Sequence, residues 1–312
     1  MLANANKAIR YIHPENESFP SRIIKLFARV LRFKKKIERD IQSGKINHQP
    51  AKIPDSLVEN AIIETSEIAG HTVWTLKPKQ NQTDAAILFL HGGAYIYSMQ
   101  DVHWQFAEEL LRKTNATIII PDYPLAPQAT ALDAFAFMDA LYAQIQETTS
   151  LEQIILMGDS AGAGLALGFA QSLRDAQKPL PQQVILLAPF LDVSMRNPDN
   201  TDAEKQCHIL TIKGLQLAGT AYAGNLDVED YRVSPIYGDF SDLPNLSIFI
   251  GTHDVFIADV RKLASKLERE NIAFNYFEYP KMVHDWVVLA QLPEAQHALG
   301  QVVNLITNTP IE

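Results

Sequence analysis

Short apolar runs alternate with helical patterns along most of the chain. The apolar runs cover residues 85–90, 117–120, 153–157, 184–187, 247–250 and 274–277. Helical spacing of apolar residues separates most of them, at residues 102–112, 129–145, 161–175 and 259–269. Continuous apolar strands that alternate with helices predict an α/β fold, in which helices cover both faces of a mostly parallel sheet.

Three stretches depart from this alternation. Residues 60–76 alternate around Ala69-Gly70 and predict an antiparallel hairpin, whereas residues 1–50 are polar and helical in pattern, with no strand signal. No strand pattern occurs between Leu191 and Val233 either, and an insert at this edge of the sheet would cover a site there. We therefore predict an N-terminal helical lid segment over residues 1–52 and an α/β domain over residues 53–312, with a lid insertion at about 192–232.

Bulk composition narrows the class of protein. Apolar residues make up 47% of the 312 residues, which is enough for one sizeable core. Cys207 is the only cysteine, which excludes a disulfide framework and suits a reducing compartment. The chain has no apolar run of the length of a membrane span and no signal-peptide pattern, so a cytoplasmic protein without stable membrane insertion is expected.

Charge is distributed unevenly. Residues 1–52 hold 12 Lys and Arg against 4 Asp and Glu, a net charge of +8, and the remainder carries −17. Such an acidic body argues against nucleic acid as a partner. The basic segment 22–39 carries Ile23, Phe27, Val30 and Leu31 at helical spacing. We predict an amphipathic helix packed on the acidic body, with a surface helix that binds anionic lipid as the alternative.

The pentapeptide Gly158-Asp159-Ser160-Ala161-Gly162 joins an apolar run to a helical pattern. A strand, a sharp turn with the serine at its apex and a helix would lift the hydroxyl above the sheet, as in a nucleophile elbow. With Gly164, the same segment also matches the cofactor loop of short-chain dehydrogenases. That alternative fails, because such a loop belongs on the first strand and no tyrosine here has a lysine four residues on.

A nucleophilic serine needs a base, and the base needs a carboxylate that orients it. Asp254 follows an apolar run, and His284 lies in a loop after the last such run. The resulting order of serine, acid and histidine is the order of the catalytic residues in α/β-hydrolases. The competing His297 lies inside a helical pattern, and Asp259 and Asp285 are weaker candidates for the acid. The predicted catalytic residues are Ser160, Asp254 and His284.

Acyl transfer also needs N–H donors for the negative charge that develops on the carbonyl oxygen. The segment His91-Gly92-Gly93-Ala94 follows a predicted strand, where a hydrolase places this loop. We predict an oxyanion hole made by Gly92, Gly93 and Ala161, with His91 and Asp159 as structural support. The sequence has no H-E-x-x-H motif and no cluster of Cys and His, so neither a metal nor another cofactor is expected.

These motifs resemble the hormone-sensitive-lipase-like branch of the α/β-hydrolases, which includes bacterial carboxylesterases. The family motifs H-G-G-G, D-Y-R-L-A-P-E, G-D-S-A-G and D-P-L correspond here to residues 91–94, 122–128, 158–162 and 254–256. The resemblance runs from about residue 85 to 290. It implies the α/β-hydrolase fold, the same triad, a lid made of N-terminal helices and an insert, and dimers through the last strand. Ala94, Pro124 and Gln128 depart from the motifs.

The sequence therefore predicts a serine carboxylesterase that hydrolyses short- to medium-acyl esters through an acyl-enzyme. Its expected partners are a small-molecule ester and, through the last strand, a second copy of the chain. Two alternatives stay open on the same fold. One is an arylformamidase or peptidase, and the other is a non-catalytic member that binds a ligand.

Overall fold

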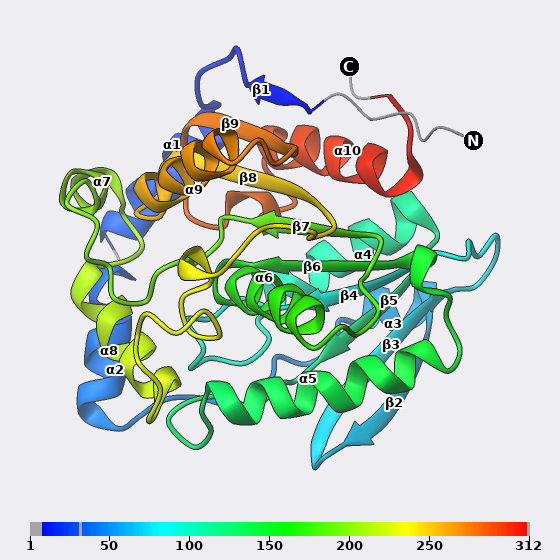
Figure 1. Ribbon diagram of the computed structural model, residues 1–312. Helices are drawn as coiled ribbons and strands as arrows, with labels where there is room; N and C mark the ends of the chain where they lie inside the picture. The colour runs from blue at the N-terminus through cyan, green and yellow to red at the C-terminus, as the bar shows by residue number, and fades with distance from the viewer. Residues whose placement is uncertain (1–7, 31–32, 311–312) are drawn as a thin grey trace.

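A nine-stranded sheet forms the centre of the protein, as the computed structural model in Figure 1 shows for residues 8–30 and 33–310. The strands lie in the order β1-β9-β8-β7-β6-β4-β5-β3-β2. Their bounds are β1 Arg10–Ile12, β2 Ala61–Ile68, β3 His71–Pro78, β4 Ala86–Leu90, β5 Thr117–Pro121, β6 Ile154–Asp159, β7 Gln183–Leu187, β8 Asn245–His253 and β9 Phe274–Val283. β3 pairs antiparallel with β2 and β5, and the other pairings are parallel, which confirms the predicted sheet.

Helices cover both faces of this sheet (Figure 1). One core lies between the sheet and three helices, α5 (Ala131–Gln146), α6 (Ser160–Asp175) and α9 (Ile257–Arg269). The core on the opposite face involves α3 (Asp55–Asn60), α4 (Asp101–Thr114) and α10 (Pro293–Thr307). The predicted arrangement of helices on both faces is therefore confirmed.

The central strands explain the continuous apolar runs in the sequence. Every residue of β4, β6 and β7 is buried. Leu88 and Leu90 of β4 belong to one core, while Ile87 and Phe89 belong to the other. Since successive side chains point to opposite faces and both faces are covered, an apolar residue is favoured at each position.

Two segments outside the sheet pack against each other at the left of Figure 1. The first contains α1 (Phe19–Val30) and α2 (Lys36–Ser43), and the second contains α7 (Asn200–Gln206) and α8 (Ile212–Ala223). The Thr211 hydroxyl donates to Glu38 over 2.7 Å and joins the two segments. The helices fall within the ranges predicted for a lid, and that role stays a proposal.

Helix α1 differs from its prediction in orientation. Ile23, Phe27 and Val30 were expected to pack on the acidic body, but they are exposed by 37%, 60% and 68%. Leu31, the fourth residue of that pattern, lies outside the described residues. The prediction was wrong because polar contacts, not apolar ones, attach this helix to the body. None of the helices described is long and apolar enough to cross a membrane.

A short strand occurs where the sequence predicted none. β1 lies within residues 1–50 and pairs in parallel with β9 over Tyr276–Glu278. Three residues are too few to produce a detectable alternation, so the strand forms through its partner and not through its own pattern. β1 covers part of the outer edge of β9, which a dimer through the last strand would use. That homodimer stays a prediction.

Candidate active site

The turn between β6 and α6 places Ser160 at its apex. The backbone of Ser160 has φ 51°, in the left-handed region that residues other than glycine rarely adopt. A Cβ atom on Gly158 would lie 2.5 Å from the carbonyl carbon of Gly162, and one on Gly162 would lie 2.0 Å from the Leu90 oxygen. The two glycines are therefore required for the sharp turn.

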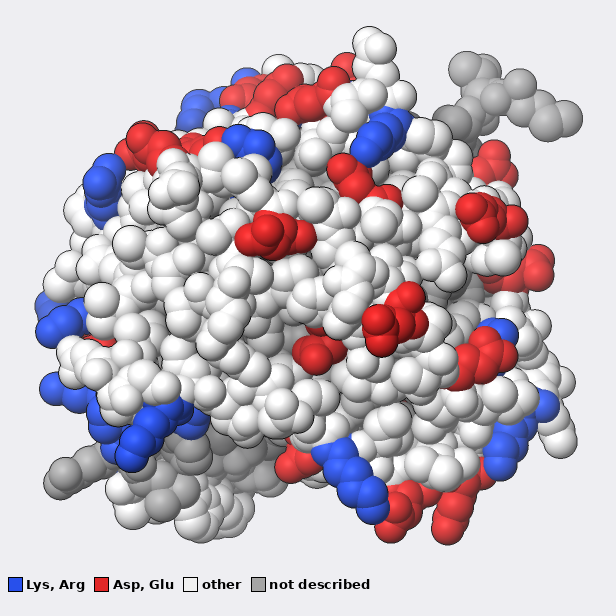
Figure 2. All heavy atoms as spheres, turned by 90° about the horizontal axis from the view of Figure 1, so that it is seen from below, with Lys and Arg blue, Asp and Glu red and all other residues white. Residues whose placement is uncertain are grey.

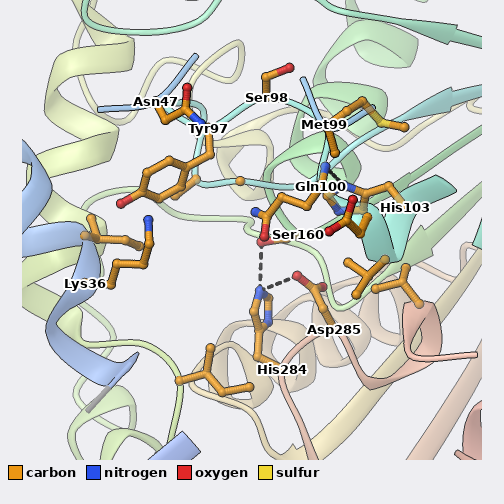
Figure 3. Close-up of a pocket in the computed structure, with 18 of the residues that line it drawn as sticks. Lys36, Asn47, Tyr97, Ser98, Met99, Gln100, His103, Ser160, His284 and Asp285 are labelled. Atoms are coloured by element: carbon orange, nitrogen blue, oxygen red, sulfur yellow. Dashed lines mark hydrogen bonds and ion pairs between the residues drawn. The ribbon is translucent and has the colours of Figure 1, made fainter. Parts of the chain in front are cut away.

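Three predicted side chains meet at the C-terminal edge of the sheet, and of these Figure 3 labels Ser160 and His284. The Ser160 hydroxyl oxygen lies 2.9 Å from His284 Nε2, and His284 Nδ1 lies 2.8 Å from Asp254 Oδ2. The other oxygen of Asp254 accepts the backbone N–H of Phe256 over 3.0 Å. Asp254 and His284 follow the ends of β8 and β9, so parallel strands that end at one edge bring the three residues together.

In the loop after β4, one of the three predicted oxyanion donors is not available to a substrate. The N–H of Gly92 donates to Asp159 Oδ1 over 2.9 Å, so it points into the fold and is not available to a substrate. Gly92 must be a glycine there, because a Cβ atom would lie 2.2 Å from Asp159 Oδ2. Gly93 and Ala94 line the pocket, and their N–H groups donate to no acceptor among the described residues.

His91 holds this loop from behind. Its Nδ1 donates to the Gly92 carbonyl over 2.8 Å, and its ring stacks on Tyr123 at 4.5 Å between centroids. The Tyr123 hydroxyl in turn donates to the His91 carbonyl over 2.7 Å. Burial lowers the pKa of His91 to about 4, so the ring is neutral at physiological pH. These contacts are those of a supporting residue and not of a base.

Asp285 is a site residue that the sequence analysis considered only as a rival of Asp254. Its carboxylate oxygen Oδ2 lies 2.9 Å from His284 Nε2, beside the bond to Ser160 (Figure 3). Burial raises the pKa of Asp285 to about 6, against the opposing effect of His284. In the sequence, the only sign of this role was that Asp285 is adjacent to His284. The structure adds the turn at Asp285, with φ 54°, which brings the carboxylate to Nε2.

The imidazole of His284 is thus held between two carboxylates. Burial by itself lowers the pKa of His284, but Asp254 and Asp285 outweigh burial and raise this pKa well above its ordinary value. The ring therefore takes up a proton more readily than a free histidine does. Such a histidine can remove a proton from Ser160 and stabilise the charged form that results.

His103 is a second residue that the sequence did not reveal. It extends from the first turn of α4, and its Nε2 lies 3.3 Å from Asp159 Oδ2. Its Nδ1 accepts the N–H of Gln100 over 3.0 Å, so the proton of the neutral ring is on Nε2 and faces Asp159. Asp159 therefore joins His103 to the loop at Gly92, which fits the supporting role predicted for it.

A pocket of about 620 Å³ opens in front of Ser160. In Figure 3, Ser160, His284 and Asp285 lie on one side, across the pocket from Lys36 and Tyr97. Apolar side chains from both outer segments complete the wall, namely Ile37, Ile209, Leu210 and Leu215. The volume is typical of small-molecule sites. In the described part of the chain, no group of three His, Cys, Asp or Glu residues could hold a metal ion.

Comparison with known proteins agrees with this geometry. The chain belongs to the α/β-hydrolase fold family, whose model matches residues 87–288. An esterase of Acinetobacter venetianus is 28% identical over 230 residues, covering 72% of this chain and 76% of that protein. An acetyl esterase of Salmonella agona is 30% identical over 226 residues, covering 69% of each.

A solved structure supports the fold independently. A hormone-sensitive lipase from a metagenome library superposes with a TM-score of 0.79 at 21% identity, over 95% of this chain and 100% of that one. The family match and the relatives confirm that the chain is an α/β-hydrolase related to esterases and lipases, as the motifs predicted, and the hormone-sensitive lipase shares its fold. The relatives also support the predicted class of enzyme, a carboxylic ester hydrolase.

Proposed function

We propose that this protein is a serine carboxylesterase that hydrolyses short- to medium-acyl esters through an acyl-enzyme on Ser160. The proposal rests on one observation above all, the hydrogen-bonded chain from Ser160 through His284 to Asp254 at the pocket floor. A serine hydroxyl is a poor nucleophile by itself, and a hydrogen-bonded imidazole is the group that activates it. Asp254 keeps the proton of the neutral ring on Nδ1 and leaves Nε2 free to accept.

In the first half of the reaction, His284 Nε2 takes the proton of Ser160 as the serine oxygen bonds to the ester carbonyl carbon. The tetrahedral intermediate places its negative charge on the carbonyl oxygen, which accepts hydrogen bonds from the N–H groups of Gly93, Ala94 and Ala161. The carbon–oxygen bond to the alcohol then breaks, and His284 gives its proton to the leaving alcohol. Water repeats the sequence on the acyl-enzyme, releasing the acid and restoring Ser160.

The oxyanion donors in this proposal differ from the predicted set by one residue. Ala94 takes the place of Gly92, whose N–H is bound to Asp159. Donation comes from the backbone, so an alanine serves as well as the third glycine of the family motif. Ala94 has φ 53° and Gly93 has φ 131°, conformations that turn this loop sharply beside Ser160.

Hydrolysis rates across a series of esters test the proposed substrate class. For a pocket of this size we expect kcat/KM for p-nitrophenyl esters to peak at about two to six acyl carbons and to fall at least about tenfold by dodecanoate. An aryl formamide and a peptide amide belong in the same series, because related hydrolases cleave such bonds. Faster turnover of either than of any ester would replace the proposal by an arylformamidase or a peptidase.

The pH dependence of the reaction tests the role of Asp285. Only the neutral form of His284 can accept the proton of Ser160, and a carboxylate beside Nε2 favours the charged form. Removing that charge with Asp285→Asn lowers the pKa of His284, so the acidic limb of kcat/KM moves to lower pH. We expect the variant to keep a larger fraction of its maximal activity at mildly acidic pH than the wild type does.

A matched variant separates this effect from a general loss of charge. Asp101→Asn removes another carboxylate that lines the pocket, on a residue that has no contact with His284 among those described. Its acidic limb should coincide with that of the wild type. An acidic limb that stays in place in Asp285→Asn would show that this carboxylate does not act on His284.

A further inference from the structure

Helix α1 presents its apolar side chains to solvent. Its five large apolar residues with high exposure are Phe19, Ile23, Leu26, Phe27 and Val30, at 73%, 37%, 59%, 60% and 68%. At 3.6 residues per turn these five positions fall within an arc of about 100° on the helix surface. The buried residues Ser21 and Ala28 lie on the opposite side of the helix. This is the reverse of the orientation of a helix that contributes to a core.

Polar contacts hold the helix in this orientation. The hydroxyls of Ser18 and Ser21 donate to Glu294 of α10 over 3.0 and 2.9 Å. Further along the helix, Lys25 Nζ lies 3.3 Å from His253 Nδ1, and Arg29 Nη2 lies 2.9 Å from His208 Nε2. Because these bonds attach the polar side of α1 to the body, the apolar side has no described segment of this chain to cover it.

Basic residues lie along one edge of the apolar face. Arg22 and Arg29 project beside the apolar arc, and the exposed Lys35 follows at the end of the next turn. The whole segment 1–52 carries +8 and the remainder −17. In Figure 2, one group of basic side chains lies at the lower left, on the side where Figure 1 places α2 and α8, and other basic side chains lie among the acidic ones.

Charge decides which occupant suits this face. Two copies meeting through α1 on a twofold axis would bring two basic rims together, which is unfavourable. A bilayer that contains anionic lipid offers negative headgroups around an apolar interior, and amphipathic helices of this composition lie in such interfaces. We propose that α1 attaches the protein to an anionic membrane surface, with its apolar face in the bilayer interface and Arg22 at the headgroups.

The position of α1 determines which part of the protein faces the membrane. Arg29 touches His208, and the next two residues, Ile209 and Leu210, line the pocket. The chain that follows α1 reaches the pocket at Lys36 and Ile37. Attachment through α1 therefore sets the pocket beside the membrane, where esters dissolved in the bilayer are concentrated. The attachment itself does not depend on the proposed esterase activity.

Sedimentation with vesicles tests the attachment. We expect the full-length protein to pellet with vesicles of equal parts phosphatidylglycerol and phosphatidylcholine, and far less with phosphatidylcholine alone. The double variant Leu26→Gln/Phe27→Gln should partition about 100-fold more weakly, since two large apolar side chains leave the interface. Arg22→Gln should weaken binding about fivefold. Val58→Gln, at a 55% exposed residue of α3, is the matched control and should bind as the wild type does.

A fluorescent probe gives an independent measurement. Trp74, Trp104 and Trp286 are all buried, so Phe27→Trp would add an exposed tryptophan. Its emission should shift to shorter wavelength with the anionic vesicles. The proposal is overturned if the protein stays in the supernatant, or if the double variant pellets as well as the wild type. A dimer that needs Leu26 and Phe27 in sedimentation velocity, without vesicle binding, would assign the face to a second copy instead.

Discussion

Replacing Ser160 by alanine is expected to lower kcat for p-nitrophenyl butyrate by about 10⁶-fold. The substitution removes the oxygen that attacks the carbonyl and leaves the pocket otherwise intact. Because Ser160 has φ 51°, alanine has to adopt the same left-handed conformation, which serine already tolerates. The variant should therefore fold, with a thermal unfolding midpoint close to that of the wild type. Steady-state kinetics on purified protein provide the measurement.

Ser98 supplies the control for this experiment. It also lines the pocket, but its hydroxyl donates to Asp122 and not to a histidine. Ser98→Ala should keep kcat within about tenfold of the wild type, since no transition-state contact is lost. Activity of Ser160→Ala near that of Ser98→Ala would remove Ser160 from the mechanism.

Asp254→Asn is expected to lower kcat by about 10⁴-fold, because the amide no longer holds the proton of His284 on Nδ1. An asparagine NH₂ group can donate to Nδ1, which moves the ring proton to Nε2, where it blocks acceptance from Ser160. The substitution also removes a carboxylate that stabilises the charged ring of His284. The measurement is kcat at the pH optimum, with circular dichroism to confirm that the variant is folded.

Asp259 offers a matched comparison, since both carboxylates follow β8 and both are buried. Asp259 lies in the first turn of α9 and accepts hydrogen bonds from Asn197 and Asn200, away from His284. Asp259→Asn should keep most of the wild-type kcat. Equal losses in the two variants would mean that general destabilisation, and not orientation of His284, explains the effect of Asp254→Asn.

The sheet and the elbow could be predicted from the sequence because their causes are local. Strands buried on both faces require continuous apolar runs, and β4 at Ala86–Leu90 falls on the run at residues 85–90. The elbow requires glycine at positions 158 and 162, because the neighbouring backbone leaves no room for a Cβ atom. Patterns of this kind can be read without knowing the rest of the fold.

Features that depend on distant partners could not be predicted in this way. The sequence predicts that the N–H of Gly92 is free to donate to a substrate. In the structure this N–H donates to Asp159, which lies 67 residues away in the chain. Asp285 acts on His284 only through the turn that brings its carboxylate to Nε2. The orientation of α1 is set by contacts with Glu294 and His208. The amphipathic pattern of α1 does not show that these distant residues bind its polar side.

The most direct test of the central claim is to locate the residue that becomes covalently modified. A p-nitrophenyl alkyl phosphonate reacts with the nucleophile of a serine esterase and stays attached, so mass spectrometry of the intact protein and its peptides can find it. The account predicts one adduct per chain, on Ser160, with loss of esterase activity in proportion to labelling, and no adduct in Ser160→Ala. Esterase activity that survives complete labelling of Ser160, or an adduct on another residue that abolishes it, would contradict the account.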